Sequence, residues 1–298
     1  MHYRQLANTE LNISEVSFGA MSLSLEHQHN HQLLHQALDL GINYFDTADL
    51  YDKGFNEESL GKAFKGIRDE VIVASKVGNV WRQDGSTWDW NPSPEHIRKA
   101  IMDSLRRLQT DYLDLYQLHG GTIDDPIDDI ITCFEDLKKQ GWIRYYGISS
   151  IRPKVIRRFA EHSDVVSVMM QYSLLDRRPE ESCLDYLHEH NISVLVRGAL
   201  AKGLLANKAA SDYLGHSSDE VARLQQELDG VVLPSRTRAQ SAIRYPLAHP
   251  AVASVVAGAS HSAQLAENAG AGHSPALSLE ERQQLANSFP VTRYEKHR

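Results

Sequence analysis

The feature that most constrains the fold is an alternation of two hydrophobic patterns along the chain. Short apolar runs rich in β-branched and aromatic residues are separated by segments whose apolar residues recur every three or four positions. The first pattern is typical of buried strands and the second of helices that cover a sheet. The apolar runs lie at residues 15–20, 43–47, 71–77, 113–119, 145–149, 166–172, 192–196 and 253–257.

Strands that alternate with helices are expected to be parallel, because each helix returns the chain to the same end of the sheet. Eight units favour closure into a (β/α)8 barrel over an open sheet. No Gly-x-Gly-x-x-Gly motif follows the first run, so the open dinucleotide-binding sheet lacks its fingerprint. We predict an α/β fold with one barrel domain over residues 1–298. An N-terminal β-hairpin at Tyr3–Ile13, with a turn near Asn8–Glu10, is expected to plug the bottom of the barrel.

Proline and glycine mark the expected helix ends. Ser93-Pro94, Asp125-Pro126 and Arg152-Pro153 place proline where the first helical turn accepts it. Gly41 and Gly141 follow helical runs, as C-terminal caps do.

Charge and cysteine content limit the partners and the compartment. The formal net charge is -8, with both signs mixed along the chain, which argues against nucleic acid as a partner. No apolar run is long enough to cross a bilayer, and the segment after Met1 has no signal-like apolar core. Cys133 and Cys183 are expected to be buried thiols rather than a disulfide, which fits a reducing compartment. We predict a cytoplasmic protein without a membrane partner.

Four polar residues follow the second, third and fourth runs. Asp46, Lys76 and His119 each lie at or next to the end of a run, and Tyr51 lies on the loop after Asp46. In a barrel of parallel strands, active sites lie at the C-terminal ends of the strands, where these side chains would converge. We therefore predict that they form one proton-transfer site.

The four side chains suit the reduction of an aldehyde or ketone. A tyrosine phenol, with an ordinary pKa near ~10, is a slow acid at neutral pH unless a neighbouring ammonium favours the phenolate. Lys76 would provide that charge for Tyr51, Asp46 would hold Lys76, and neutral His119 would orient the carbonyl. The hydride must come from a cofactor, because no side chain can supply one.

Two connections are long, and long loops are commonly functional. Residues 78–92 contain Trp81, Trp88 and Trp90, from which we predict a substrate-lining wall with Trp81 and Trp88 as contacts. Residues 204–234 contain an amphipathic stretch around Asp219–Leu228.

Histidines cluster near the start of the first helical segment, where two of them have the i, i+4 spacing that zinc can use. No cysteine or acidic ligand is arranged with them, so a solvated helix entry is favoured and no metal site is predicted. The residues concerned are His27, His29, His31 and His35.

Several segments resemble the aldo-keto reductase family. Asp46-Thr47-Ala48-Asp49-Leu50-Tyr51, with Glu57 and Leu60-Gly61, is similar to the D-T-A-x-x-Y…E-x-x-L-G signature. Similar family segments are Arg144–Ser149, Gln171–Leu175 and Val255–Asn268. The resemblance implies a TIM barrel that binds NAD(P)H, with Asp46, Tyr51, Lys76 and His119 as the catalytic tetrad. Residues 174–180 place the chain nearer the bacterial and potassium-channel-β-subunit-like branch.

The resemblance also implies cofactor contacts. Small residues after the last two strands would let backbone N–H groups approach phosphates at a helix N-terminus. The implied contacts are Ser149, Ser150 and Gln171 at the nicotinamide carboxamide; Arg197 at the ring; Gly198, Leu200, Lys202 and Gly203 along the pyrophosphate; and Gly258, Ser260, Gln264, Glu267 and Asn268 at the adenosine end.

The chain departs from the family pattern in three respects. Ser150 replaces an asparagine, and Arg197 replaces the tyrosine that stacks on nicotinamide in many members. Gly258 and Gln264 stand where aldose-reductase-like members have the lysine and arginine that bind the 2′-phosphate. Arg236, Arg238 or His261 could compensate for them. We expect NADPH, with NADH as an alternative.

The sequence therefore predicts an NAD(P)H-dependent oxidoreductase that reduces small aldehydes or ketones, with Tyr51 as general acid. Two alternatives stay open: a redox-sensing, cofactor-binding regulatory subunit, and an NAD-dependent alcohol dehydrogenase. The oligomeric state and the particular carbonyl substrate do not follow from the sequence.

Overall fold

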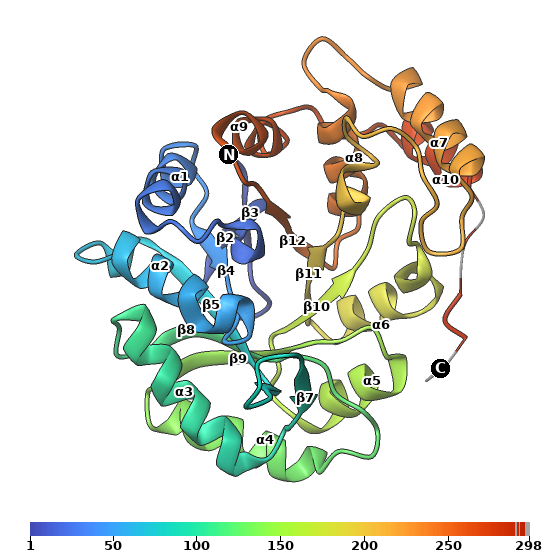
Figure 1. Cartoon of the computed structure of the whole chain (residues 1–298). Helices are drawn as coiled ribbons and strands as arrows, with labels where there is room; N and C mark the ends of the chain where they lie inside the picture. Colours follow the sequence, from blue (N-terminus) through green and yellow to red (C-terminus); the bar gives the residue numbers. More distant parts are fainter. Residues whose placement is uncertain (290, 292, 296–298) are drawn as a thin grey trace.

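A closed barrel of eight parallel strands forms the centre of the molecule (Figure 1). The structure is a computed structural model that describes residues 1–289, 291 and 293–295. The strand order around the ring follows the chain, and β12 pairs with the first barrel strand to close it. All eight apolar runs are confirmed as barrel strands. They are β3 (Val16–Gly19), β4 (Tyr44–Asp46), β5 (Ile72–Val77), β8 (Leu113–Leu118), β9 (Ile143–Ser149), β10 (Ser167–Gln171), β11 (Ser193–Arg197) and β12 (Val252–Gly258).

Helices surround the barrel, as Figure 1 shows. Their apolar faces pack in one core cluster with the outer face of the strands and with one another, which explains the period of three to four in the sequence. The (β/α)8 prediction is thereby confirmed. The helices are α1 (His27–Asp39), α2 (Phe55–Ala63), α3 (Pro94–Leu108), α4 (Ile127–Lys139), α5 (Pro153–His162), α6 (Cys183–Glu189), α7 (Ser218–Gly230), α8 (Arg238–Leu247), α9 (Ser262–Gly270) and α10 (Leu279–Asn287).

The predicted N-terminal plug is present. Strands β1 (Tyr3–Gln5) and β2 (Asn12–Ser14) pair in antiparallel register. Leu6, Leu11 and Ile13 are buried in one apolar cluster with inward-facing barrel residues, among them Leu115 and Leu195. The hairpin thus closes the end of the barrel opposite to the C-terminal ends of the strands.

Several local predictions are confirmed. Ser93 caps α3 by accepting the His96 N–H, with Pro94 as the first helical residue. Gly41 and Gly141 follow α1 and α4 with φ of 85° and 77°, a backbone that glycine adopts at low cost. Cys133 and Cys183 are free and buried.

The two long connections contain regular structure. Residues 78–92 form a hairpin of β6 (Asn79–Trp81) and β7 (Trp88–Trp90) that follows β5. The amphipathic stretch in the second connection is α7, which begins with a capping box between Ser217 and Glu220. Of the helices in the described ranges, none is both long and apolar enough for a membrane span.

Candidate active site

The four polar residues predicted from the sequence converge at the C-terminal ends of β4, β5 and β8. Asp46 is the last residue of β4, Lys76 lies one residue before the end of β5, and His119 follows β8. Tyr51 begins the short 3-10 turn η2 (Tyr51–Gly54). The Lys76 ammonium donates to Asp46 Oδ1, to the Thr47 carbonyl oxygen at 2.8 Å and to the Tyr51 phenol oxygen at 3.3 Å. The site therefore contains a linked acid, amine and phenol.

Gln117 provides a second side-chain hydrogen bond to Asp46. Its Nε2 donates to the second oxygen of Asp46 at 3.1 Å, from a fully buried position in β8. Asp46 is thus held on both oxygens, by Lys76 and by Gln117. Sequence reasoning missed Gln117, although a polar residue inside the apolar run Leu113–Leu118 was a signal for it.

Lys76 carries its charge inside the protein. The side chain is only 1% exposed, and burial opposes the ammonium. The Asp46 carboxylate and Tyr51 nevertheless raise the pKa of Lys76 above its ordinary value. A positive charge in a weakly solvated site beside the phenol favours development of negative charge on the Tyr51 oxygen.

His119 is neutral at physiological pH. Burial, followed by the charges of Lys76 and Arg197, lowers the pKa of His119 to about 3. The rings of Tyr51 and His119 meet edge to face with centres 6.0 Å apart. Nδ1 of His119 is buried without a hydrogen-bond partner in the described chain. A neutral imidazole has one N–H donor, which suits an uncharged carbonyl oxygen.

Two of the predicted nicotinamide-end residues, Gln171 and Arg197, are brought together at the ends of β10 and β11. Arg197 donates to Oε1 of Gln171 at 2.8 Å, and Nε2 of Gln171 donates to Asp176 at 2.9 Å. The Tyr213 phenol oxygen lies 3.4 Å from the same Nε2. Sequence reasoning assigned no role to Asp176 or Tyr213, because the first was treated only as a family marker and the second lies in a long connection.

The two serines at the end of β9, Ser149 within the strand and Ser150 directly after it, differ in exposure. Ser149 is half-buried, whereas Ser150 is buried and its Oγ accepts the Arg152 N–H at 3.2 Å. The hydroxyl of Ser150 thus supports the turn before α5. Its contact with a carboxamide stays a prediction.

The predicted adenosine-end residues surround the N-terminus of α9. Gly258 is exposed, and a Cβ built on it would lie 2.9 Å from Ser22 Oγ, so the close approach of the chain favours glycine. Gln264 Oε1 accepts the Ser260 N–H at 3.1 Å, and Asn268 donates to the Gly258 carbonyl at 3.1 Å. Glu267 accepts from Thr237 at 3.2 Å. An exposed glycine and serine before a helix N-terminus fit a phosphate-bearing ligand.

The segment after β11, the strand that pairs with β12, supplies a second exposed stretch. Gly198 and Lys202 are exposed, and Leu200 and Gly203 are half-buried. Ala201 and Lys202 have φ of 46° and 57°, the left-handed region that non-glycine residues rarely adopt. Contacts of the surrounding loop must hold this strained turn, so the segment has one defined conformation and is not a flexible linker.

Arg236 is not available as a phosphate ligand, so its expected compensating role is wrong. The side chain is 1% exposed. Its guanidinium pairs with Glu281 at 2.5 Å and donates to the Val231 carbonyl at 2.8 Å and the Ala276 carbonyl at 2.9 Å. Arg238 is half-exposed but pairs with Asp229, and His261 caps α9.

The three tryptophans of the β6–β7 hairpin have different surroundings. Trp90 is half-buried, and its Nε1 donates to Asp125 at 3.0 Å. Trp81 is half-buried and donates to the Leu50 carbonyl at 3.0 Å. Trp88 is 48% exposed, with its ring centre 5.4 Å from that of Trp81. Trp81 and Trp88 therefore lie beside the loop of Tyr51, and their contact with substrate stays a prediction.

The histidines of α1 are engaged with neighbouring groups. His31 stacks on His35, whose Nε2 bonds to the Ala63 carbonyl at 2.8 Å. His27 stacks on Phe55, and its Nδ1 lies 2.8 Å from Ser59 Oγ. Within the described ranges, His, Cys, Asp and Glu side chains form no group of three or more suited to a metal ion.

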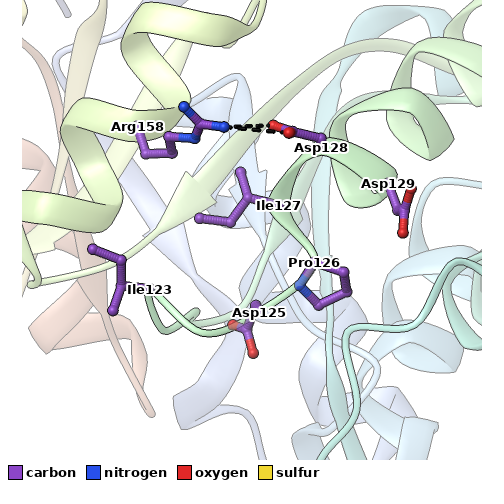
Figure 2. Close-up of a pocket in the computed structure, with 7 residues that line it drawn as sticks. All are labelled: Ile123, Asp125, Pro126, Ile127, Asp128, Asp129 and Arg158. Atoms are coloured by element: carbon purple, nitrogen blue, oxygen red, sulfur yellow. Dashed lines mark hydrogen bonds and ion pairs between the residues drawn. The ribbon is translucent and has the colours of Figure 1, made fainter.

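A separate cavity of about 370 Å³ lies near the N-terminus of α4 (Figure 2). Its polar walls are acidic, with one arginine from α5. Figure 2 shows Arg158 directed at Asp128, and the two are 3.0 Å apart. The positive charge of Arg158 is therefore paired with one of the acidic lining residues. The lining residues are Ile123, Asp125, Pro126, Ile127, Asp128, Asp129 and Arg158.

A closed parallel barrel with the buried Asp46–Lys76 pair beside the half-buried Tyr51 phenol, at the C-terminal ends of its strands, is suited to an oxidoreductase of the barrel type. The sequence model of the Aldo/keto reductase family matches residues 15–288. The chain belongs to this family and is an NAD(P)H-dependent oxidoreductase. The family predicted from the sequence is confirmed.

Individual relatives agree with this membership. The chain is 48% identical over 307 residues to the oxidoreductase YqkF of Bacillus subtilis, and the match covers 100% of both proteins. It is 30% identical over 229 residues to a protein of Escherichia coli named NADH-specific methylglyoxal reductase, covering 70% of each.

The fold is also similar to a solved aldo-keto reductase, AKR11C1 of Bacillus halodurans. The holo form matches with a TM-score of 0.95 at 48% identity, covering 100% of this chain and 99% of that one. The apo form matches with a TM-score of 0.86 at 46% identity, over the same shares.

Proposed function

We propose that this enzyme reduces a small aldehyde or ketone with NADPH, and that Tyr51 is the general acid. The observation that carries the proposal is the charged, buried Lys76, whose amine lies 3.3 Å from the Tyr51 phenol oxygen. Such an amine stabilises the phenolate that is left when Tyr51 gives up its proton.

Each of the four residues has a distinct task in this proposal. Asp46, supported by Gln117, keeps the Lys76 ammonium directed at Tyr51. Neutral His119 donates a hydrogen bond that orients the substrate carbonyl. Tyr51 transfers its proton to the carbonyl oxygen, which becomes the hydroxyl of the product alcohol. A bound NAD(P)H supplies the hydride that the carbonyl carbon receives.

The residues present fit such a cofactor. Gln171, Ser149 and Ser150 would hold a carboxamide, and Arg197 would face the nicotinamide ring. The exposed Gly198 and Lys202 segment would lie along the pyrophosphate. The α9 N-terminus would hold the adenosine end with the residues Gly258, Ser260, Gln264, Glu267 and Asn268. The high similarity to a holo form supports this fit.

We favour NADPH over NADH. The exposed hydroxyl of Ser260 and the side-chain amide of Gln264, both at the proposed adenosine end, can donate hydrogen bonds to a 2′-phosphate. NADH is the competing cofactor in this proposal, because one relative is named as NADH-specific. A cytoplasmic location and one barrel domain over 1–298 are part of the same proposal.

A fluorescence titration with NADPH and NADH tests the proposal directly, because Trp81 and Trp88 can report binding. We expect tighter binding of NADPH, followed by turnover with small carbonyl probes, including methylglyoxal. Tighter binding of NADH would contradict the cofactor assignment. Tight binding without turnover of any carbonyl would contradict the reductase and favour the regulatory subunit.

A further inference from the structure

The β6–β7 hairpin contacts the loop that carries the proposed general acid. Trp81 Nε1 donates to the carbonyl oxygen of Leu50 at 3.0 Å. Leu50 directly precedes Tyr51, so this bond fixes the backbone from which the phenol projects. The interaction joins residues that are 31 positions apart in the chain.

The turn on the other side of Tyr51 has an unusual backbone. Asp52, Lys53 and Gly54 have φ of 48°, 56° and 92°. Two consecutive non-glycine residues in the left-handed region persist only where surrounding contacts hold them. Lys53 has such a contact, since its Nζ lies 5.1 Å from the centre of the Trp81 ring. Trp81 therefore holds the chain on both sides of Tyr51.

The base of the same hairpin contacts the loop of His119. Asn79 Nδ2 donates to the His119 carbonyl oxygen at 3.2 Å. The ring of Trp90 lies against the next residue, since a Cβ built on Gly120 would be 3.2 Å from it. Trp90 also donates to Asp125 at 3.0 Å, further along that loop. One short hairpin thus contacts both the loop that carries Tyr51 and the loop that carries His119.

We propose that the β6–β7 hairpin sets the position of Tyr51 relative to His119, and that Trp81 is its main positioning residue. The inference rests on the proposed role of Tyr51 as general acid. Proton transfer and carbonyl orientation need both groups at one oxygen, and small misplacements of reacting groups are costly. Lys76 fixes the phenol oxygen of Tyr51, while Trp81 fixes the backbone directly before Tyr51.

Trp81→Phe is the sharpest test, because it keeps a ring beneath Lys53 and against Trp88 but removes the indole N–H. We expect kcat to fall about 10-fold for small and large aldehydes alike, with KM and the NADPH dissociation constant within about 2-fold of the parent. Trp142→Phe is the matched control, because it makes the same substitution at a half-buried position directly before β9, at the end of the barrel opposite to Tyr51. It should leave kcat unchanged.

A double variant shows whether the effect passes through Tyr51. In single-turnover reactions, Trp81→Phe should cause no further loss when it is added to Tyr51→Phe, because the group it positions is then absent. A full additional 10-fold loss would overturn the inference. Lys53→Met should lower kcat in the same direction as Trp81→Phe, since it removes the contact on the other side of Tyr51.

The outcomes also separate this inference from the predicted substrate wall. If Trp81→Phe changes KM according to substrate size and leaves kcat intact, Trp81 contacts substrate and the positioning role is wrong. Parent-like kinetics in Trp81→Phe would also overturn it. Parent-like turnover in Tyr51→Phe would instead contradict the proposed general acid. Equal thermal midpoints for Trp81→Phe and Trp142→Phe would show that the kinetic difference is not a folding defect.

Discussion

The Lys76 amine lies 3.3 Å from the Tyr51 phenol oxygen, and its other two hydrogen bonds go to Asp46 and to the Thr47 carbonyl. An ammonium has three N–H donors, so all of them are used within this site. Lys76 is therefore fixed in direction as well as in charge. Because the arrangement is fixed, a change at each partner of Lys76 should have its own distinct effect.

Tyr51→Phe removes the proposed acid and keeps the ring that meets His119 edge to face. We expect kcat to fall by about 10²- to 10⁴-fold, the usual contribution of general acid catalysis, because no other group donates the proton. NADPH binding, measured by fluorescence titration, should stay within about 2-fold of the parent. Loss of cofactor binding together with activity would contradict a purely chemical role.

Lys76→Met should destabilise the fold as well as abolish activity. It leaves the Asp46 carboxylate buried without its cation, and breaking a buried ion pair costs about 3–5 kcal/mol of unfolding free energy. Urea denaturation measures this change. Arg82→Met is the control, since Arg82 and Asp89 form an exposed pair and its loss should change stability little. Equal effects of the two substitutions would contradict the buried charge pair.

Asp49 should make stability depend on pH. Its Oδ1 is buried without a hydrogen-bond partner in the described chain. Burial, followed by the negative charge of Glu57, raises the pKa of Asp49 to about 8, although the positive charges of Arg107 and Lys76 act to lower it. In the unfolded chain it titrates near 3.8. Between these values the folded state keeps a proton that the unfolded state has released. The free energy of unfolding therefore falls as pH rises through this window.

Asp49→Asn removes the titrating carboxyl group, and with it this contribution to the pH dependence of stability. We expect the variant and the parent to be similar in stability near the acidic end of the window, and the variant to be the more stable near pH 8. Urea denaturation at both ends measures the difference. A stability difference that is the same at both pH values would contradict the assignment.

Arg236→Met should lower stability without changing the cofactor preference. Arg236 is 1% exposed and joins Glu281 to carbonyls of two loops, so its loss leaves several acceptors unpaired. We expect a loss of about 3 kcal/mol or more. The ratio of NADPH to NADH dissociation constants should equal that of the parent. Arg238→Met, at the half-exposed neighbouring arginine, is the matched comparison. If Arg236→Met alone changed the ratio of dissociation constants, Arg236 would have a role in cofactor binding after all.

The sequence alone determined the barrel and the approximate position of its reacting groups. An apolar run that must be buried on both faces can be recognised locally, and alternation with helical segments leaves few topologies. Because parallel strands present their C-terminal ends at one face, Asp46, Lys76 and His119 had to be close once the strands were recognised. The N-terminal hairpin and the caps at Ser93 and Gly41 also followed from local patterns.

The tertiary structure alone decided which side chains support those groups. Gln117 on Asp46, Tyr213 on Gln171 and Trp81 on Leu50 are pairs separated by 71, 42 and 31 positions. Arg236 had seemed available for a phosphate, but its partner Glu281 lies 45 positions away. The physical reason is that a sequence pattern reports burial and periodicity over a few residues. A hydrogen bond of fixed length depends instead on the paths of two loops, which only the packed barrel sets.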